Sequence, residues 1–155
     1  MDFQISALEP RQFAALFDLP QPFLAQHLAI RRIANAKPGF PCRVSLQDAE
    51  VGEQLLLIHY MHQCVASPYR ASHAIFVRKG VARAELQVGE VPPVLRSRVL
   101  SLRAFDKDAM MVSAELCDGV GVEKLLRAQF SEPAVAYVHI HFAKFGCYAC
   151  RADRA

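Results

Sequence analysis

The heptapeptide AYVHIHF, which begins at Ala136, constrains the fold more than any other stretch, because its side chains alternate with a period of two. Successive side chains of a β-strand point to opposite faces of the sheet, so this pattern predicts a strand. Every second residue from Ala136 to Phe142 is apolar, and we expect this face to pack on a core. Tyr137, His139 and His141 share the other face, where we expect the two histidines to be half-exposed.

Further strand patterns recur along the chain and are mostly joined by short turns. They cover residues 2–8, 53–65, 73–80 and 100–116, the last as two strands with a turn at 106–109, while residues 135–153 form a closing hairpin. Helical patterns cover residues 9–20, 90–100 and 122–130, and residues 22–33 suggest a helical turn that runs into a strand. Because strands outnumber helices, the sequence predicts an α+β fold, with a largely antiparallel sheet and two to four short helices in one domain, residues 1–155.

The composition excludes several classes of protein. A chain of 155 residues with 53% hydrophobic and 21% charged residues is long and apolar enough for one folded core. The net charge of +3 is small and the basic residues are spread along the chain, so we expect no binding to nucleic acid. No apolar stretch approaches the roughly 20 residues of a membrane helix, and we expect no membrane partner. Five cysteines without a signal-peptide pattern indicate reduced thiols and a cytoplasmic location.

The C-terminal hairpin carries the motif CYAC, so two histidines are followed by two cysteines, Cys147 and Cys150. Histidines one residue apart on a strand are a geometry that metal sites use. In a continuing strand, however, Cys147 and Cys150 point to opposite faces, and one metal ion cannot collect all four side chains. A redox pair would need a helix N-terminus, and nothing after Cys150 resembles a helix. We therefore expect no metal and no cofactor, with His139 and His141 as the candidate ligands if a metal is held.

Two further histidines lie on the first central apolar strand. His59 and His62 point to opposite faces, so at most one of them joins a common site. His59 shares its face with Leu57 and Met61, which favours a core position. His62 lies at the strand end and is the better site candidate.

The loop KPGFPCR, residues 37–43, carries side chains suited to catalysis or binding. Its two prolines and one glycine fix the backbone, so that side chains are presented at a low entropic cost. Cys42 is a candidate nucleophile and Arg43 a candidate anion ligand. The alternative is a plain loop with a small buried thiol.

The loop SPYRASH, residues 67–73, raises the same question. Arg70 and His73 lie three residues apart, and an arginine here would hold a carboxylate or phosphate with Tyr69 beside it. The alternative is an arginine paired with an acidic neighbour across the sheet.

Several strings of the sequence resemble a known family. AKPGFPCRVSLQDAE, SPYRASHAIFVR, VPPVLRSRVLSLRAFD and VHIHFAKFGCYACR are similar, from about Asn35 onward, to the bacterial family known as domain of unknown function twelve-oh-three. The resemblance implies a single-domain bacterial protein without an assigned activity, and it directs attention to the two loops. It also implies that glycine is usual at the position of Ala109 and alanine frequent at that of Cys150, so neither side chain is expected to be essential.

We rank first the hypothesis of a domain that binds a small anionic molecule. Arg43 and Arg70 would hold the anion, because rigid loops place both guanidinium groups beside a sheet. The remaining side chains that we expect to line this pocket are Tyr69, His73, His139 and His141.

Two other classes of function stay open. A small enzyme would use Cys42 as a nucleophile with His73 as a candidate partner, or a metal bound by His139 and His141 with a third ligand. A homodimeric protein-interaction domain would use the last hairpin as a sheet edge that pairs with a second chain.

Overall fold

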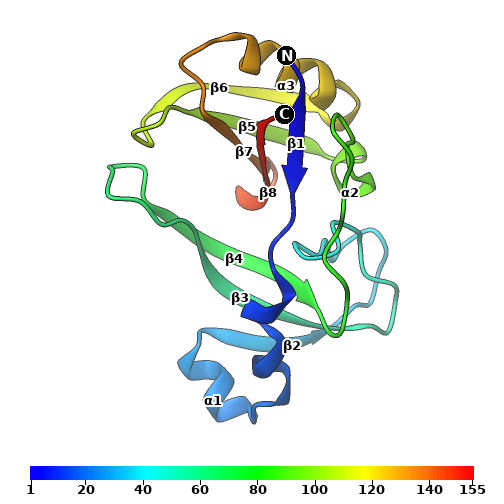
Figure 1. The fold of residues 1–155 in the computed structure, drawn as a ribbon. Coiled ribbons are helices and arrows are strands. Elements are labelled where there is room, and N and C mark those ends of the chain that lie inside the picture. Colours follow the sequence, from blue (N-terminus) through cyan, green and yellow to red (C-terminus); the bar gives the residue numbers. More distant parts are fainter.

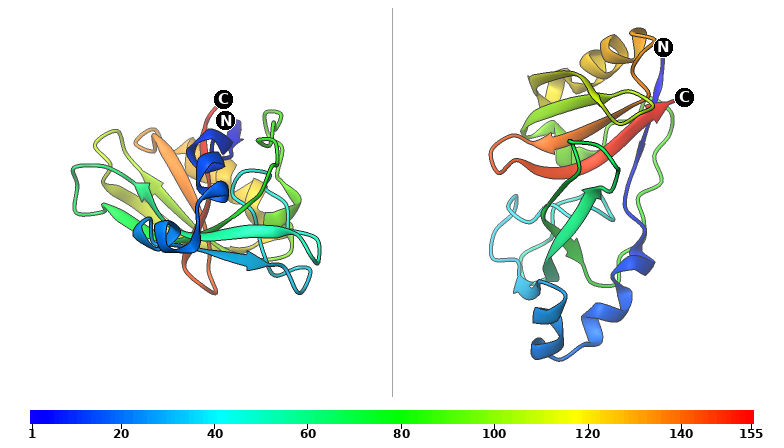
Figure 2. Two further views of the ribbon diagram at one scale, coloured as in Figure 1. Left: turned by 90° about the horizontal axis from the view of Figure 1, so that it is seen from below. Right: turned by 90° about the vertical axis from the view of Figure 1, so that its left-hand side faces the viewer.

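The computed structural model describes all 155 residues, and its strands form two antiparallel sheets that lie one above the other (Figures 1 and 2). The five-stranded sheet has the order β1-β8-β7-β5-β6, and the three-stranded sheet has the order β2-β3-β4. The strands are β1 (Phe3–Ser6), β2 (Ala29–Ile33), β3 (Gln54–Gln63), β4 (Ala71–Arg78), β5 (Val99–Phe105), β6 (Met111–Asp118), β7 (Tyr137–Phe142) and β8 (Cys147–Arg154). The α+β fold with largely antiparallel strands is thereby confirmed, with the strands divided between two sheets.

The helices are short, and two of them lie at the outer ends of this stack while the third lies beside the five-stranded sheet (Figure 1). α3 (Val122–Ser131), in the region predicted to be an amphipathic helix, buries one stripe of side chains against the five-stranded sheet. α1 (Gln21–Gln26) leads into β2, and α2 (Pro93–Arg96) precedes β5. Residues 10–18, predicted as one helix, form two 3₁₀ turns instead, which bury Phe13 and Phe17. None of these helices has the length and apolarity that crossing a membrane would require.

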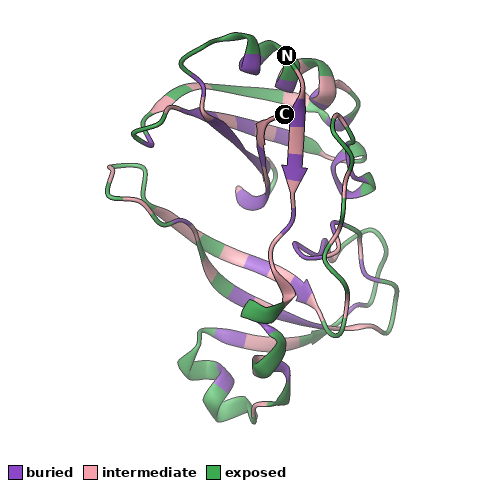
Figure 3. Ribbon diagram, viewed as in Figure 1, coloured by how far each residue is buried: buried purple, intermediate pink, exposed green.

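Buried residues occur in both sheets (Figure 3) and form two main hydrophobic cores and one small cluster of Ala34, Ala49 and Leu55. The larger core lies between the five-stranded sheet and α3, and the predicted apolar face of β7 contributes Val138, Ile140 and Phe142 to it. The smaller core packs Leu56 and Ile58 of β3 against the N-terminal 3₁₀ turns. Both cores place apolar side chains on alternate strand positions, as a two-residue period requires.

The β7–β8 hairpin contains a β-bulge that changes the expected position of the cysteines. Ile140 pairs with Cys150 but His141 pairs with Tyr148, so one extra residue of β8 lies between these two pairs. Cys147 and Cys150 therefore both lie on the apolar face, within the larger core. The prediction that they point to opposite faces is wrong, because it assumed an uninterrupted strand.

The same hairpin lies inside its sheet. β8 pairs with β7 on one side and, through residues 151–154, with β1 on the other. The sheet ends at β1 and β6 instead. Pairing of the last hairpin with a second chain, the contact assumed in the dimer hypothesis, would have only residues 147–150 of β8 outside the pairing with β1.

The face of the five-stranded sheet that carries His139 and His141 is covered by β3, β4 and the loop of residues 37–43. Gln63 at the end of β3 donates a hydrogen bond from Nε2 to the Tyr137 hydroxyl at 2.7 Å. His139 and His141 are consequently only 2% and 1% exposed. The expectation that they are half-exposed is wrong, because a second sheet covers the polar face.

Candidate functional site

Three histidines from two sheets converge where β3 ends against β7. His139 and His141 share one face of β7, as their spacing predicts, and His62 approaches them from β3. Each residue offers one imidazole nitrogen to a group of three in which all members lie within 4.8 Å of one another. We call these three side chains the histidine cluster.

The two histidines of β3 lie in different surroundings. Leu56 and Ile58 pack into the smaller core, and the β3–β4 register shifts between Tyr60 and Gln63, where both His62 and Gln63 approach β7. His59 lies on the face opposite to that of Leu56 and Ile58 and is exposed. The core position expected for His59 is wrong, because the small cluster that buries Leu55 on that face does not extend to His59.

Hydrogen bonds within the cluster are few. His141 Nδ1 lies 3.1 Å from the Gly146 carbonyl, which accepts its proton and leaves Nε2 with a free lone pair. Gly146 has φ +73° in the β7–β8 turn, a conformation that favours glycine. Nδ1 of His62 and Nδ1 of His139 are buried without any hydrogen-bond partner. Such buried polar atoms usually have one, so the cluster has spare capacity to bind a ligand.

Tyr148 packs against all three members of the cluster. Its ring stacks on His62, with centroids 5.3 Å apart and planes 11° apart. It meets His139 and His141 edge-on, at centroid distances of 5.1 Å and 5.9 Å. The bulge in β8 sets this position, because it brings Tyr148 opposite His141. Packing therefore restrains the orientation of each imidazole.

Burial keeps the imidazoles neutral. It lowers the pKa of His62 to about 4 and is the largest cause, with a smaller contribution from the charge of Arg103. Burial likewise lowers the pKa of His139 to about 3, assisted by the neighbouring His141, and that of His141 to about 3, assisted by Arg103. At neutral pH each ring therefore offers a lone pair on one nitrogen.

All three histidines border one cavity of about 240 Å³, which we call the Arg70 cavity. Arg70 and Arg103 contribute guanidinium groups to it, and neither forms an ion pair. No aspartate or glutamate lines it. The complete lining is His62, Gln63, Pro68, Tyr69, Arg70, Ala71, Arg103, Phe105, Met111, His139 and His141.

The β3–β4 loop is tied to the opposite sheet, which positions Tyr69 and Arg70 over the cavity. The Ser67 hydroxyl donates a hydrogen bond to the Ala109 carbonyl at 3.0 Å and accepts one from the Tyr69 amide at 3.1 Å. The Tyr69 ring meets Phe105 of β5 edge-on at 6.0 Å. Figure 1 shows this loop beside the turn between β5 and β6.

A larger cavity of about 390 Å³ borders the same cluster and shares His62, Gln63 and His139 with the Arg70 cavity. Its cationic lining residues are Lys107 and Arg151, and it too has no carboxylate in its lining. The Arg151 charge is already paired with Asp153, at 2.6 Å. The Arg70 cavity is therefore the one with unpaired guanidinium groups.

The structure does not bring Arg43 to this site. Its side chain is 2% exposed and fully engaged: it donates hydrogen bonds to the carbonyls of Pro41 (2.5 Å) and Tyr148 (2.8 Å) and to Cys147 Sγ (3.0 Å). Its guanidinium carbon also lies 5.0 Å from the centre of the Phe142 ring. Burial lowers the pKa of Arg43, but an arginine remains protonated in proteins. Arg43 thus joins the loop of residues 37–43 to the β7–β8 hairpin.

Cys42 and His73 also lie outside the Arg70 cavity. Cys42 is 1% exposed, and its sulfur accepts hydrogen bonds from the amides of Val44, Ser45 and Arg78. This is the small buried thiol considered as the alternative for the loop. His73 is exposed, with Nδ1 3.1 Å from the Ala74 carbonyl. A nucleophile and base built from these two side chains would need both of them to move.

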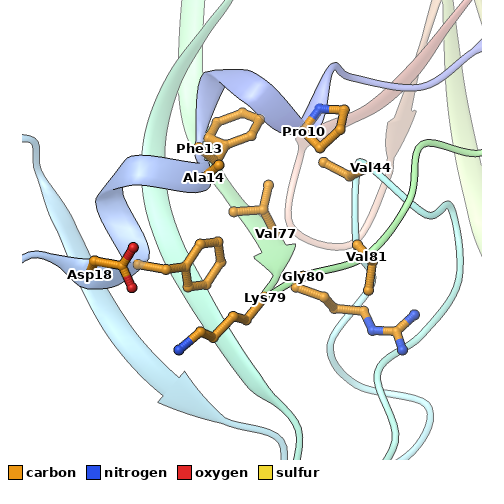
Figure 4. A pocket seen from close by; sticks show the side chains of 11 residues that line it. Pro10, Phe13, Ala14, Asp18, Val44, Val77, Lys79, Gly80 and Val81 are labelled. Carbon is orange, nitrogen blue, oxygen red and sulfur yellow. The ribbon is translucent and has the colours of Figure 1, made fainter.

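A third cavity, of about 200 Å³, lies beside the N-terminal 3₁₀ turns (Figure 4). Its walls are largely apolar, with Asp18 and Lys79 among the few charged groups. It contains no histidine or cysteine and none of the predicted site residues.

Sequence reasoning identified four residues of the Arg70 cavity, namely Tyr69, Arg70, His139 and His141, and named His62 as a candidate. It missed Arg103 and Phe105. The available signal was their position on β5, where Arg103 pairs with His139 and Phe105 with Tyr137 on the same sheet face. That signal depends on strand order, which the sequence does not show.

The chain was also compared with known proteins. No curated protein and no solved structure matches it. One family matches residues 39–154, a range that contains β3 to β8 and all three members of the histidine cluster. The chain belongs to this family, which is described as protein of unknown function (DUF1203).

Proposed function

We propose that this protein binds a small anionic molecule in the Arg70 cavity. The observation that carries the proposal is that Arg70 and Arg103 line one cavity with no carboxylate in its lining and no ion pair of their own. A guanidinium group presents a fork of donors that matches a carboxylate or phosphate. Two such groups without a protein partner favour a ligand that supplies the negative charge.

The partial burial of Arg103 strengthens this argument. Its only side-chain hydrogen bond is a long one, 3.5 Å from Nε to the Ser101 hydroxyl. Burial lowers the pKa of Arg103, which means that its charge is poorly solvated. A bound anion would replace the lost solvation and stabilise the charged form. Arg70 is exposed on the loop above and would close on the same anion.

The remaining lining suggests what the rest of the ligand looks like. Tyr69 and Phe105 supply aromatic surface and Met111 an apolar side chain, so one wall of the cavity is apolar. Neutral imidazoles of the histidine cluster provide further hydrogen-bonding groups. A carboxylate or phosphate attached to a flat or apolar body fits this lining better than a free inorganic ion.

We also propose a cytoplasmic location. All five cysteines are free thiols, and Cys64 among them is exposed. Exposed thiols persist in reducing compartments and are readily oxidised outside them.

Calorimetric titration of the untagged protein in chelator-containing buffer tests the binding proposal. Phosphate and phthalate serve as probes, since both are anions but only phthalate has an aromatic body. We expect phthalate to bind more tightly than phosphate, and Arg70→Ala and Arg103→Gln each to weaken binding by about tenfold or more.

Arg96→Ala is the matched control for charge. Arg96 is an exposed arginine of α2 without an ion pair, and it lines none of the three cavities described above. Its removal lowers the net charge equally and should leave the affinity within twofold. Equal weakening by all three variants would mean that net charge alone attracts the anions, and the proposal would be abandoned.

A further inference from the structure

We propose that His62, His139 and His141 form a binding site for one transition-metal ion, with open coordination positions toward the Arg70 cavity. The convergence of their ligating nitrogens within 4.8 Å carries this inference. It is independent of the anion, because it rests on the imidazoles rather than on the arginines. It goes beyond the pair of candidate ligands on β7, since the third ligand comes from the other sheet.

The distances in the cluster are near those that a metal site requires. Zinc binds histidine nitrogens at about 2.0–2.1 Å, which places tetrahedral ligand atoms about 3.4 Å apart. The imidazole centroids are 5.0 Å apart for His62 and His141, 6.0 Å for His62 and His139, and 6.3 Å for His139 and His141. The ligating nitrogens, which lie within 4.8 Å of one another, must move closer to reach about 3.4 Å when a metal binds.

One histidine of the cluster makes the hydrogen bond expected of a metal ligand, and the other two each have a buried nitrogen without a partner. His141 donates its Nδ1 proton to the Gly146 carbonyl, so Nε2 is the atom free to bind a metal. Metal-bound histidines commonly use their second nitrogen in this way, because the bond fixes the tautomer and the ring orientation. Only 2% of the surface of His139 is exposed, and its Nδ1 has no hydrogen-bond partner. Nδ1 of His62 is likewise buried and unpartnered. A metal ion bound to either of these Nδ1 atoms would supply the partner that it lacks.

The donor set indicates the class of metal. Three neutral imidazoles suit Zn²⁺, Fe²⁺, Co²⁺, Ni²⁺ or Cu²⁺, whereas Mg²⁺ and Ca²⁺ require oxygen ligands that the cluster lacks. Three protein ligands leave at least one coordination position for water or another molecule, as in catalytic zinc sites. The Arg70 cavity, which all three histidines border, is where that position would open.

Nearby positive charge opposes a divalent cation, so the metal would need a compensating ligand. Arg103 lines the same cavity, and the paired residue on β8 opposite His139 is Arg151. Asp153 already neutralises Arg151, which leaves Arg103 as the main unfavourable charge. Hydroxide or an anion bound at the open position would reduce that repulsion.

Titration of the metal-free, untagged protein with Co²⁺ and Zn²⁺ tests the inference. Co²⁺ bound by three imidazoles and one further ligand gives visible absorption bands, and Zn²⁺ should displace it. We expect one equivalent per chain and a loss of affinity on the order of 100-fold or more in His62→Gln and in His141→Gln. His62 is only partly buried, so this variant is the one expected to keep its fold.

His59→Gln is the matched control, because His59 lies on the same strand with its side chain exposed and outside the histidine cluster. It should bind Co²⁺ as the unaltered protein does. Metal uptake that is absent, or that is equal in His62→Gln and His59→Gln, would overturn the site. Phosphate and phthalate titrations of the metal-free protein are read separately, so failure of the metal site does not count against the anion proposal.

Discussion

At the scale of single residues, Arg43 illustrates a charged group that serves the fold. It lies in the interior with two backbone carbonyls, one sulfur and the face of Phe142 around it, and no carboxylate faces it. These groups compensate the charge through hydrogen bonds and a cation–π contact. Removal of the side chain would leave the carbonyls of Pro41 and Tyr148 buried and unpaired, which is costly.

Arg43→Met therefore lowers the free energy of unfolding by about 3 kcal/mol. Urea unfolding measures this, with Arg96→Met as the control for loss of one exposed arginine. Unchanged stability together with lost anion binding would contradict the structural role and make Arg43 a ligand-binding residue after all.

A second residue-scale prediction concerns Ala109, which has φ +59° in the turn between β5 and β6. A side chain is strained in this left-handed conformation, whereas glycine adopts it freely. Ala109→Gly should raise the free energy of unfolding by about 0.5–1 kcal/mol. The control is Ala114→Gly in the middle of β6, where the same change should lower stability by a similar amount. Equal effects of the two variants would refute the argument.

At the scale of elements, the end of α2 and the connection from it to β5 lie very close to a 3₁₀ turn, η3 (Gly119–Gly121). The Gly119 amide donates to the Arg98 carbonyl at 2.8 Å. A Cβ atom on Gly119 would lie 1.9 Å from the Leu95 carbonyl oxygen, which is backbone and cannot turn aside. Glycine is therefore needed here for the close approach of two chain segments.

Gly119→Ala should destabilise the protein by about 3 kcal/mol or more, because α2 and η3 must separate. Gly121→Ala in the same turn is the matched control, since its Cβ would meet only Cys117 Cβ, at 3.9 Å. Thermal unfolding of the two variants makes the comparison. Similar midpoints would show that the close approach is not the constraint described.

Local pattern was enough to predict most elements but not their packing. The hairpin of β7 and β8, the shared face of His139 and His141 and the helix α3 all follow from periodicity within one stretch. The bulge in β8 does not, because one extra residue leaves no signature in the alternation. The third histidine and Arg103 join the site only through the packing of one sheet on the other, and that depends on contacts distant in sequence.

At the scale of the whole molecule, burial of the histidine cluster between two sheets couples stability to pH. The pKa values of His139 and His141 are both about 3 in the fold, against about 6.5 in an unfolded chain. Below pH 6.5 the unfolded chain binds protons that the folded one does not, so stability falls as pH falls, over the range from about 6.5 to 3. Above pH 7 these histidines are neutral in both states, and the fold has its full stability with respect to them.

For metal-free protein we expect a loss of about 2 kcal/mol for each of these two histidines between pH 7.5 and pH 5. Urea unfolding at the two pH values measures it, and His59→Gln should show the same loss as the unaltered protein. His141→Gln should lose less on acidification. A free energy of unfolding that is equal at both pH values would mean that the imidazoles are solvated rather than buried.

The proposed metal site depends on the convergence of three histidines from two sheets on one point. Anomalous diffraction at the zinc edge, from crystals of the untagged protein grown with one equivalent of Zn²⁺, tests it most directly. We expect a single strong peak at about 2.0–2.1 Å from one nitrogen each of His62, His139 and His141. A peak elsewhere, or a well-ordered cluster without one, would contradict it.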